Sequence, residues 1–345
     1  MRTRLPLLLL VLALILGACG DDAATDNAGN DEAATEADPA TRTVEGAYGP
    51  VEIPVDPQRI VTDMVSVDYL TALGYDTDKI VGVFGADWYA EQPDHYLVHT
   101  LPDDVVDPGF PSDVNIEAVA ALEPDLILVP FDQIDQSPQL DALQQVAPLL
   151  AVPTSSGDTP EVRYGGEASF QDWRTTLRTF GTLLEMDDEA EAYIAETESQ
   201  LAALSEEHGD LIASITAVEA KSAPDYMAIN VLSEAQDSGV LGTILMSELG
   251  FTEPAELQAA TADEYGTVEI SEENMALLDG DILFLEVRDE TTAHEDNPLW
   301  PTLSVVQNDG VAVVGNHWEF GGAVAARHVV ADIDAALDEF ASRGA

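Results

Sequence analysis

One segment of the chain occurs twice in related form and without a gap. Residues 115–129 read NIEAVAALEPDLILV, and residues 271–285 read SEENMALLDGDILFL. Each copy begins with a residue suited to cap a helix and has an acid two positions later, then a leucine, a Pro or Gly break, an Asp and an apolar run. Helix–turn–strand units resemble one another generically, so a chance match stays the alternative. The repeat favours two similar α/β lobes.

Short apolar segments alternate with helical segments in the rest of the chain. Strands are expected at 51–53, 59–61 and 80–84, and a helix is expected at 66–74, where Gly74 stops it. Leu249-Gly250-Phe251 echoes Leu73-Gly74-Tyr75. This alternation predicts an α/β fold with parallel sheets.

Two helices are expected between the halves, at 169–184 and from 187 to about 208. The second helix has a single face, because its apolar and small residues recur at spacings of three and four. That face consists of Ile194, Thr197, Leu201, Leu204 and His208. A helix of this length spans roughly 30 Å. It therefore predicts a stiff rod between the lobes, which should move little relative to each other.

Residues 1–18 have the pattern of an export signal. Arg2 and Arg4 precede an apolar run over 5–16, and small residues precede Cys19, the only cysteine of the chain. The order Leu16-Gly17-Ala18-Cys19 resembles a bacterial lipobox, which implies a lipid on Cys19 and a protein anchored outside the cell membrane. A secreted protein with a chance cysteine is the alternative.

Acidic residues dominate the composition. Residues 19–41 carry acids and are expected to be a disordered linker, and the whole chain has 66 Asp and Glu against 12 Lys and Arg, a formal net charge of −54. Such a charge repels phosphate backbones and excludes nucleic acid as a partner. Adaptation to a high-salt habitat is one explanation of this acidic composition, and a compositional bias of the lineage is the alternative. A single cysteine excludes an internal disulfide.

The ordered motifs together resemble the substrate-binding proteins of iron-siderophore and vitamin B12 ABC importers. The resemblance covers nearly all of residues 45–340, and its segments include 49–54, 57–61, 73–74, 80–82, 122–128, 242–251, 270–285, 297–299, 305–308 and Val311. It implies a class III periplasmic-binding-protein fold, in which a single long backbone helix joins two Rossmann-like lobes. The expected domains are an N-terminal α/β lobe at 42–186, the backbone helix at 187–208 and a C-terminal α/β lobe at 209–345.

The family also suggests a role for the repeated acids. Its members dock onto a permease dimer through one exposed glutamate on each lobe, and the matching positions are Glu117 and Glu273, with Glu272 as a near neighbour. A carboxylate in a first helical turn also benefits from the helix dipole, so a purely local role is the alternative.

Candidate ligand-binding residues follow the expected strands, because ligands of α/β lobes bind beyond the carboxyl ends of parallel strands. Aromatic and arginine side chains at these positions would suit a wide cleft that grips a bulky chelate. The candidates are Trp88, Tyr89, Phe131, Arg163, Tyr164, Arg288, His317, Trp318 and Phe320. Each residue taken singly could equally be a packed loop residue.

The expected ligand is a ferric siderophore whose own oxygens hold the iron, so no cofactor, protein-bound metal or catalytic residue is expected. The histidines are scattered, and no nucleophile elbow, phosphate loop or zincin motif occurs. The acidic surface disfavours an anionic catecholate chelate and favours a hydroxamate. Cobalamin or haem is the alternative ligand, and a metal-dependent enzyme is a more distant one. The expected partners are this ligand and an ABC permease with its ATPase, and the protein is expected to be a monomer.

Overall fold

The computed structural model describes residues 40–343 with short gaps. These gaps fall at 92–94, 98, 131–133, 135–136, 153–154, 157–168, 171, 235–239, 264–265, 272 and 320–321. The part of the chain from Pro39 onward forms one compact unit. The signal segment, Cys19 and almost all of the expected linker lie outside the described residues. None of the described helices is long and apolar enough to cross a membrane.

The N-terminal lobe is built on a four-stranded parallel sheet in the order β4-β3-β5-β6. Its strands are β3 (Ile60–Asp63), β4 (Ile80–Phe84), β5 (Leu126–Pro130) and β6 (Leu149–Val152). Helix α1 (Met64–Leu73) packs on one face, while α3 (Ile116–Ala121) and α5 (Leu140–Val146) cover the other. The hairpin of β1 (Thr41–Gly46) and β2 (Gly49–Pro54) precedes this sheet. Strand β1 thus starts at Thr41, the last residue of the segment expected to be linker.

The C-terminal lobe contains a five-stranded mixed sheet in the order β11-β10-β9-β12-β13. Its strands are β9 (Ala217–Ser222), β10 (Met227–Asn230), β11 (Thr267–Glu269), β12 (Ile282–Val287) and β13 (Val311–Val314). The expected parallel pairing holds for β9, β12 and β13. Strand β10 is antiparallel to both of its neighbours, because the four residues between β9 and β10 suffice only for a hairpin.

The repeat corresponds to a shared structural device. Asp125 precedes β5, its N–H donates to the Arg59 carbonyl at 3.0 Å, and its carboxylate accepts the Arg59 N–H at 3.0 Å. Asp281 precedes β12 and makes the same pair of bonds with Thr216, at 2.8 and 2.7 Å. Each aspartate therefore fixes the start of its strand beside the first strand of the lobe's parallel core.

The two lobes also share one way of ending a helix. Gly74 and Gly250 both have positive φ, at 71° and 85°. The next N–H donates to the carbonyl five residues earlier in each case, from Tyr75 to Leu70 and from Phe251 to Met246. This is the Schellman closure that glycine permits. The sequence echo between these segments is confirmed as a structural echo.

A layer of helices connects the two sheets. It contains α1, α7 (Trp173–Leu184), α8 (Asp187–Ile212), α10 (Leu241–Leu249) and α14 (Ala323–Arg343). One apolar core runs from the inner face of the N-terminal sheet through these helices to the inner face of the C-terminal sheet. The outer face of the C-terminal sheet has a core of its own. The lobes are therefore joined by packed helices as well as by the chain.

Helix α8 is the expected rod. Its predicted face is confirmed, because Ile194, Thr197, Leu201, Leu204 and His208 are all buried, together with Ala190 and Ile212. The helix extends four residues beyond its expected end. The helix expected at 169–184 begins only at Trp173, since Ser169–Phe170 (β8) pairs with Ser155–Ser156 (β7).

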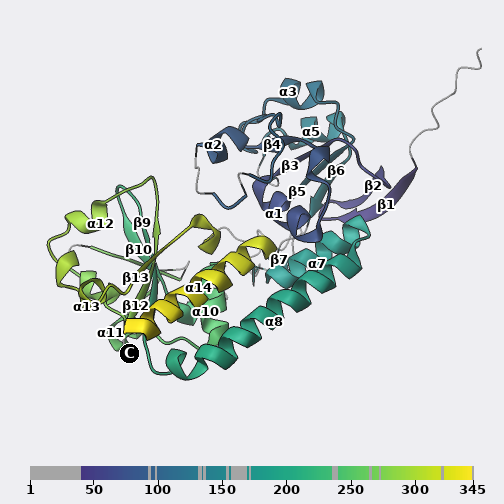
Figure 1. Cartoon of the computed structure of the whole chain (residues 1–345). Helices are drawn as coiled ribbons and strands as arrows, with labels where there is room; N and C mark the ends of the chain where they lie inside the picture. Colours follow the sequence, from purple (N-terminus) through teal and green to yellow (C-terminus); the bar gives the residue numbers. More distant parts are fainter. Residues whose placement is uncertain are drawn as a thin grey trace, which may run out of the picture. The chain divides into compact units, whose positions relative to one another are not determined.

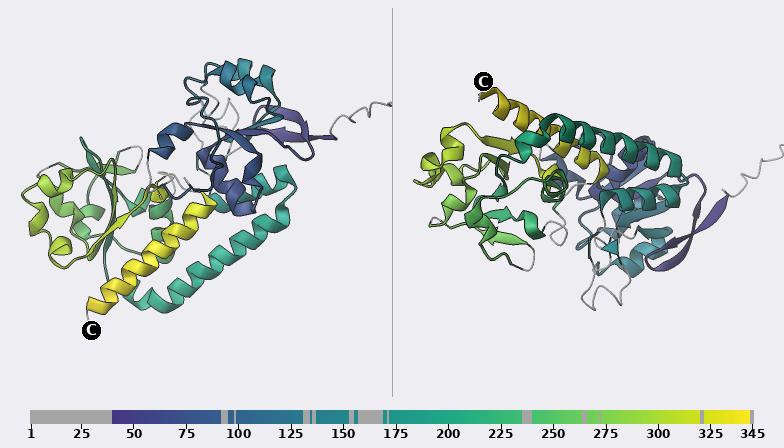
Figure 2. Two further views of the ribbon diagram at one scale, coloured as in Figure 1. Left: turned by 45° about the horizontal axis from the view of Figure 1, so that its top comes forward. Right: turned by 90° about the horizontal axis from the view of Figure 1, so that it is seen from below.

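Helices α8 and α14 lie side by side (Figure 1 and Figure 2) and run parallel. Arg327 on α14 donates to Thr197 and to the Tyr193 carbonyl on α8, and His208 further along α8 lies against Asp334. Because residue numbers rise together along both helices, their carboxyl ends lie at the same end of the layer.

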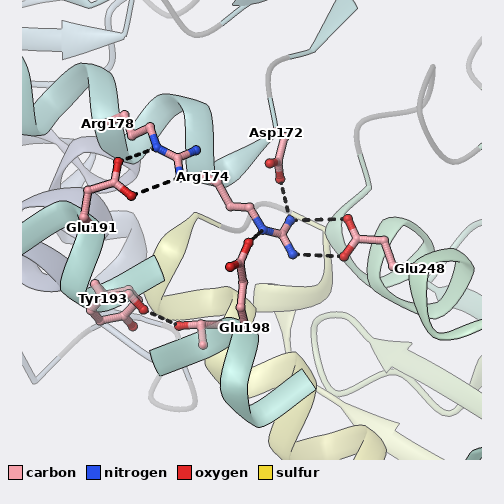
Figure 3. A network of polar contacts seen from close by, with 8 residues as sticks. Asp172, Arg174, Arg178, Glu191, Tyr193, Glu198 and Glu248 are labelled. Carbon is pink, nitrogen blue, oxygen red and sulfur yellow. Dashed lines mark hydrogen bonds and ion pairs between the residues drawn. The ribbon is translucent and has the colours of Figure 1, made fainter. Parts of the chain in front are cut away.

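A network of carboxylates around Arg174 joins α7, α8 and α10 (Figure 3). The Arg174 guanidinium donates to Asp172 at 3.0 Å, to Glu198 at 3.2 Å and to Glu248 at 3.0 Å. Its side chain is only 14% exposed. Arg178, on the same helix, pairs with Glu191.

A buried carboxylate, Asp68 on α1, receives the start of α14. It accepts the N–H groups of Val324 at 2.9 Å and Ala325 at 3.0 Å, and the Tyr96 hydroxyl donates to it at 2.9 Å. Asp68 thus caps a helix of the other half of the chain. Burial raises its pKa to about 6.

The remaining short helices lie in the connections between these elements. They are η1 (Thr77–Lys79), α2 (Ala86–Ala90), η2 (Leu232–Glu234), α11 (Ala255–Gln258), η3 (Met275–Leu278), α12 (Ala293–Asp296), η4 (Trp300–Thr302), α13 (Ser304–Gln307) and η5 (Asn316–Trp318).

Candidate functional site

The loop after β4 is held by one carboxylate. Asp107 accepts the N–H groups of Gly85 at 3.0 Å, Asp87 at 2.9 Å and Gly109 at 2.7 Å. Both glycines have positive φ, at 77° and 89°, which a side chain would strain. Asp107 therefore fixes the loop after β4 against the turn that contains Gly109.

This arrangement presents an aromatic patch, which we define as Trp88, Tyr89 and Phe110. Trp88 is 45% exposed and Phe110 is 44% exposed. The Trp88 ring lies 4.8 Å from that of Tyr89 and 6.3 Å from that of Phe110, centroid to centroid. Burial raises the pKa of Tyr89 to about 12, so its hydroxyl stays protonated at neutral pH. Trp88 and Tyr89 were predicted from the sequence, whereas Phe110 was not, although the glycine turn before it was a signal.

A series of ring contacts leads from the aromatic patch to the C-terminal lobe. The Tyr89 ring lies 4.9 Å from His95, His95 stacks on Tyr96 at 4.9 Å, and Tyr96 lies 5.7 Å from His317. His328 on α14 also contacts Tyr96, at 5.6 Å. Burial lowers the pKa of His95 to about 4, so His95 is neutral at pH 7. The predicted residue His317 is therefore connected to Trp88 and Tyr89 through aromatic rings.

A charged cluster lies at the carboxyl ends of β9 and β12. We define it as Lys221, Glu286, Arg288 and Glu319. Arg288 donates to Glu286 at 3.1 Å and pairs with Glu319, and Glu319 also accepts from Lys221. Arg288 donates further to the Tyr226 hydroxyl at 3.2 Å. Of these residues only Arg288 was predicted, although Lys221 also stands at a strand end.

The charged cluster is nearly balanced in charge. Its two cations face the carboxylates of Glu286 and Glu319. Burial raises the pKa of Glu286, and it raises the pKa of neighbouring Glu219 to about 8, so Glu219 is mostly protonated at pH 7. Carboxylates thus balance the charge of Arg288, and the cluster has little net positive charge.

The segment 317–319 connects the series of ring contacts with the charged cluster. His317 joins the ring series and donates from Nε2 to Asp332 at 2.7 Å, while Glu319 joins the charged cluster. Trp318 between them turns into the core. Its ring stacks on Phe284 at 4.7 Å and its Nε1 donates to Asp332 at 2.8 Å.

The exposed fraction of the Trp318 side chain is 0%. Trp318 is therefore a core residue. The lack of a side chain at Gly242 leaves room for its ring. Four other predicted residues, Phe131, Arg163, Tyr164 and Phe320, lie outside the described residues, and so does Cys19.

The first copy of the repeat has the expected local structure at its acid. The Asn115 side chain accepts the Ala118 N–H at 3.1 Å and caps α3, and Glu117 lies exposed in the first turn. Its carboxylate is therefore available to a partner.

The second copy differs. Glu273 is exposed, but it precedes η3 instead of occupying the second position of a helix capped by Ser271. The expected cap is wrong because the Asn274 carboxamide oxygen takes both the N–H and the hydroxyl of Ser271, at 2.6 and 3.0 Å. The Ser271 hydroxyl thus donates to Asn274 in place of accepting from a helix.

Two α/β lobes with an aromatic patch on one and a charged cluster on the other are typical of a binding protein. Residues 60–316 match the family model described as periplasmic binding protein, and the chain belongs to this family.

Curated relatives extend over nearly the whole chain. A probable siderophore-binding lipoprotein, YfiY of Bacillus subtilis, is 24% identical over 94% of this chain and 94% of its own length. The iron(3+)-hydroxamate-binding protein YxeB of the same organism is 22% identical over 89% of this chain and 87% of its own.

Solved structures share the fold. The petrobactin-binding protein YclQ of Bacillus subtilis superposes with a TM-score of 0.63 at 18% identity, over 87% of this chain and 99% of its own. At this identity the likeness establishes the architecture, and it confirms the expected class III fold with its two lobes and long helix.

Proposed function

We propose that the protein is a lipid-anchored substrate-binding protein of an ABC importer, which captures a ferric siderophore between its lobes and delivers it to a membrane permease. The observation that carries this proposal is the pairing of an exposed aromatic patch on one lobe with a charged cluster on the other. The relatives YfiY and YxeB support the ligand class, since their names refer to siderophores and ferric hydroxamates. Binding, and no catalysis, is the proposed role.

The charges favour a hydroxamate chelate. Lys221 and Arg288 already face Glu286 and Glu319, so a strongly anionic catecholate would have to compete with carboxylates for the same donors. A neutral or cationic hydroxamate can stack on Trp88 beside Arg288, and the carboxylates of Glu286 and Glu319 do not repel it. The siderophore's oxygens fill the coordination sphere of the iron, and the protein supplies no ligand to it.

Delivery requires contact with the permease and proximity to the membrane. The exposed carboxylates of Glu117 and Glu273 are the proposed docking groups, one on each lobe. A lipid on Cys19 is the proposed anchor. Charge reversal at both glutamates together should abolish stimulation of the permease-linked ATPase without changing ligand affinity.

Tryptophan fluorescence tests the ligand class. Trp88 is 45% exposed, whereas Trp173, Trp300 and Trp318 are at most 8% exposed. A ferric hydroxamate such as ferrioxamine should therefore quench mainly Trp88, and Trp88→Phe should remove most of the quenching. Titrations with a ferric catecholate, cobalamin and haem form the comparison. Saturable binding of one of these, with no response to the hydroxamate, would overturn the proposed ligand.

A further inference from the structure

His208 lies in an unusual position, near the carboxyl end of α8. It occupies the helix face that packs on α14, between the buried residues Leu204 and Ile212, and it is 6% exposed. Its Nε2 is buried and makes no hydrogen bond of acceptable geometry to any described residue. That nitrogen lies 3.2 Å from Asp334 Oδ1 and 3.6 Å from Asp338 Oδ1.

Carboxylates converge on this nitrogen from both helices. Glu207 of α8 and Asp338 of α14 have oxygens that lie, with a His208 ring nitrogen, all within 4.8 Å of one another. Asp334 and Asp338 are one turn apart on α14, and like charges at this spacing repel. Three carboxylates therefore surround one buried imidazole.

The helix ends increase the negative potential. Helices α8 and α14 run parallel, so the negative ends of two helix dipoles lie near this group. The last turn of α8 has no basic residue, and the basic residue in the last turn of α14 is Arg343. Arg343 is bound elsewhere, to Glu339 at 2.7 Å and to the Asn308 carbonyl at 3.2 Å. No described lysine or arginine neutralises Asp334 or Asp338 in an ion pair.

We propose that Glu207, His208, Asp334 and Asp338 form a binding site for a divalent cation of the zinc class. An imidazole nitrogen with carboxylate oxygens is a donor set that suits Zn²⁺, whereas Ca²⁺ and Mg²⁺ prefer oxygen alone. Bonds of about 2.0–2.1 Å in a tetrahedron place ligand atoms about 3.4 Å apart. The two distances from Nε2, 3.2 and 3.6 Å, bracket that value. The exposed glutamate can reach the ion by a rotamer change.

Such an ion would join α8 to α14 and thus brace the helix layer that connects the lobes. It would lie away from the aromatic patch and the charged cluster, so its role is structural and is independent of the siderophore. The site was not predicted from the sequence, because its two pairs of ligands lie 126 or more positions apart and become neighbours only when the helices pack.

The test is a titration of the chelator-treated full-length protein with Zn²⁺ alone, by calorimetry and by thermal unfolding. One saturable site and a rise in Tm are expected. His208→Gln should abolish this site, and Asp338→Asn should weaken it more than about tenfold, the lower limit for loss of even a supporting residue at a metal site. His99→Gln, at an exposed histidine of the N-terminal lobe, is the matched control and should bind normally.

Co²⁺ provides a readout that a purely structural role of His208 would not give. The protein should show the intense visible absorption of four-coordinate Co²⁺, and this absorption should vanish in both site variants. The proposal would be overturned if His208→Gln and Asp338→Asn both bound Zn²⁺ as strongly as the wild type does. It would also be overturned by the absence of saturable binding, or by a Tm rise of equal size with Ca²⁺ and Mg²⁺.

Discussion

The two lobes share a scaffold and differ at the carboxyl ends of their strands. Asp125 and Asp281 make the same backbone bonds, and Gly74 and Gly250 end helices in the same way. The N-terminal edge nevertheless carries exposed aromatic rings, and the C-terminal edge carries ion pairs. Backbone hydrogen bonding therefore constrains the strand starts and the helix ends of both lobes. The side chains at the carboxyl ends of the strands are not constrained in this way and differ in kind between the lobes.

The largest effect is expected at the cap that Asp68 provides to α14. Asp68→Ala should lower the free energy of unfolding by about 2–3 kcal/mol at pH 5, because buried N–H groups of Val324 and Ala325 lose their acceptor. Denaturant unfolding followed by circular dichroism measures this loss. The exposed Asp78→Ala in the same lobe is the control, and an equal effect of both variants would contradict the cap.

The same carboxylate makes stability depend on pH. Burial raises the pKa of Asp68 from 3.8 to about 6, so its favourable contribution is complete below pH 3.8 and is lost as the pH rises through about 6. The carboxamide of the Asp68→Asn variant does not titrate. The difference in stability should therefore shift toward the variant by about 2–3 kcal/mol between pH 4 and pH 7. A difference that is constant over this range would show that Asp68 does not titrate as described.

Packing of the C-terminal core gives the next largest effect. A Cβ on Gly242 would overlap the Trp318 ring, whereas a Cβ on Gly209 of α8 would meet no atom within 4 Å. Gly242→Ala should destabilise the protein by about 1–3 kcal/mol. Gly209→Ala should stabilise it by about 0.5–1 kcal/mol, because helical glycine costs chain entropy. Thermal unfolding of both variants checks the opposite signs, and a neutral Gly242→Ala would contradict the tight packing of Trp318.

The smallest effect is expected at the Arg174 network between the helices. Arg174→Met leaves Asp172, Glu198 and Glu248 without their shared cation and should cost about 1 kcal/mol at low salt. Arg178→Met, which removes a single exposed pair, should cost less. Both losses should shrink in high salt, because salt screens exposed charges. A salt-independent loss in Arg174→Met would assign its effect to packing.

Much of the fold could be predicted from the sequence, because it follows from local patterns. The buried face of α8 follows from the spacing of its apolar residues. The end of α1 at Gly74 follows from the positive φ that this helix end requires. The failures arose where a distant or unexpected partner decided the structure. The Asn274 side chain accepts the hydrogen bonds of the Ser271 N–H and hydroxyl, so Ser271 does not cap a helix. Gly242 leaves room for the Trp318 ring in the core. The same holds for the site, since Phe110, Lys221 and Glu319 join it only through contacts between segments far apart in sequence.

The aromatic patch of one lobe and the charged cluster of the other are proposed to bind one chelate together. Calorimetric affinity for ferrioxamine in the wild type, Trp88→Ala and Arg288→Gln tests this proposal most directly. Each substitution should weaken binding by about tenfold or more, the effect of losing about 1.4 kcal/mol of contact, while Trp88→Phe should retain most of the affinity. Unchanged affinity in both variants would place the ligand elsewhere and contradict the account.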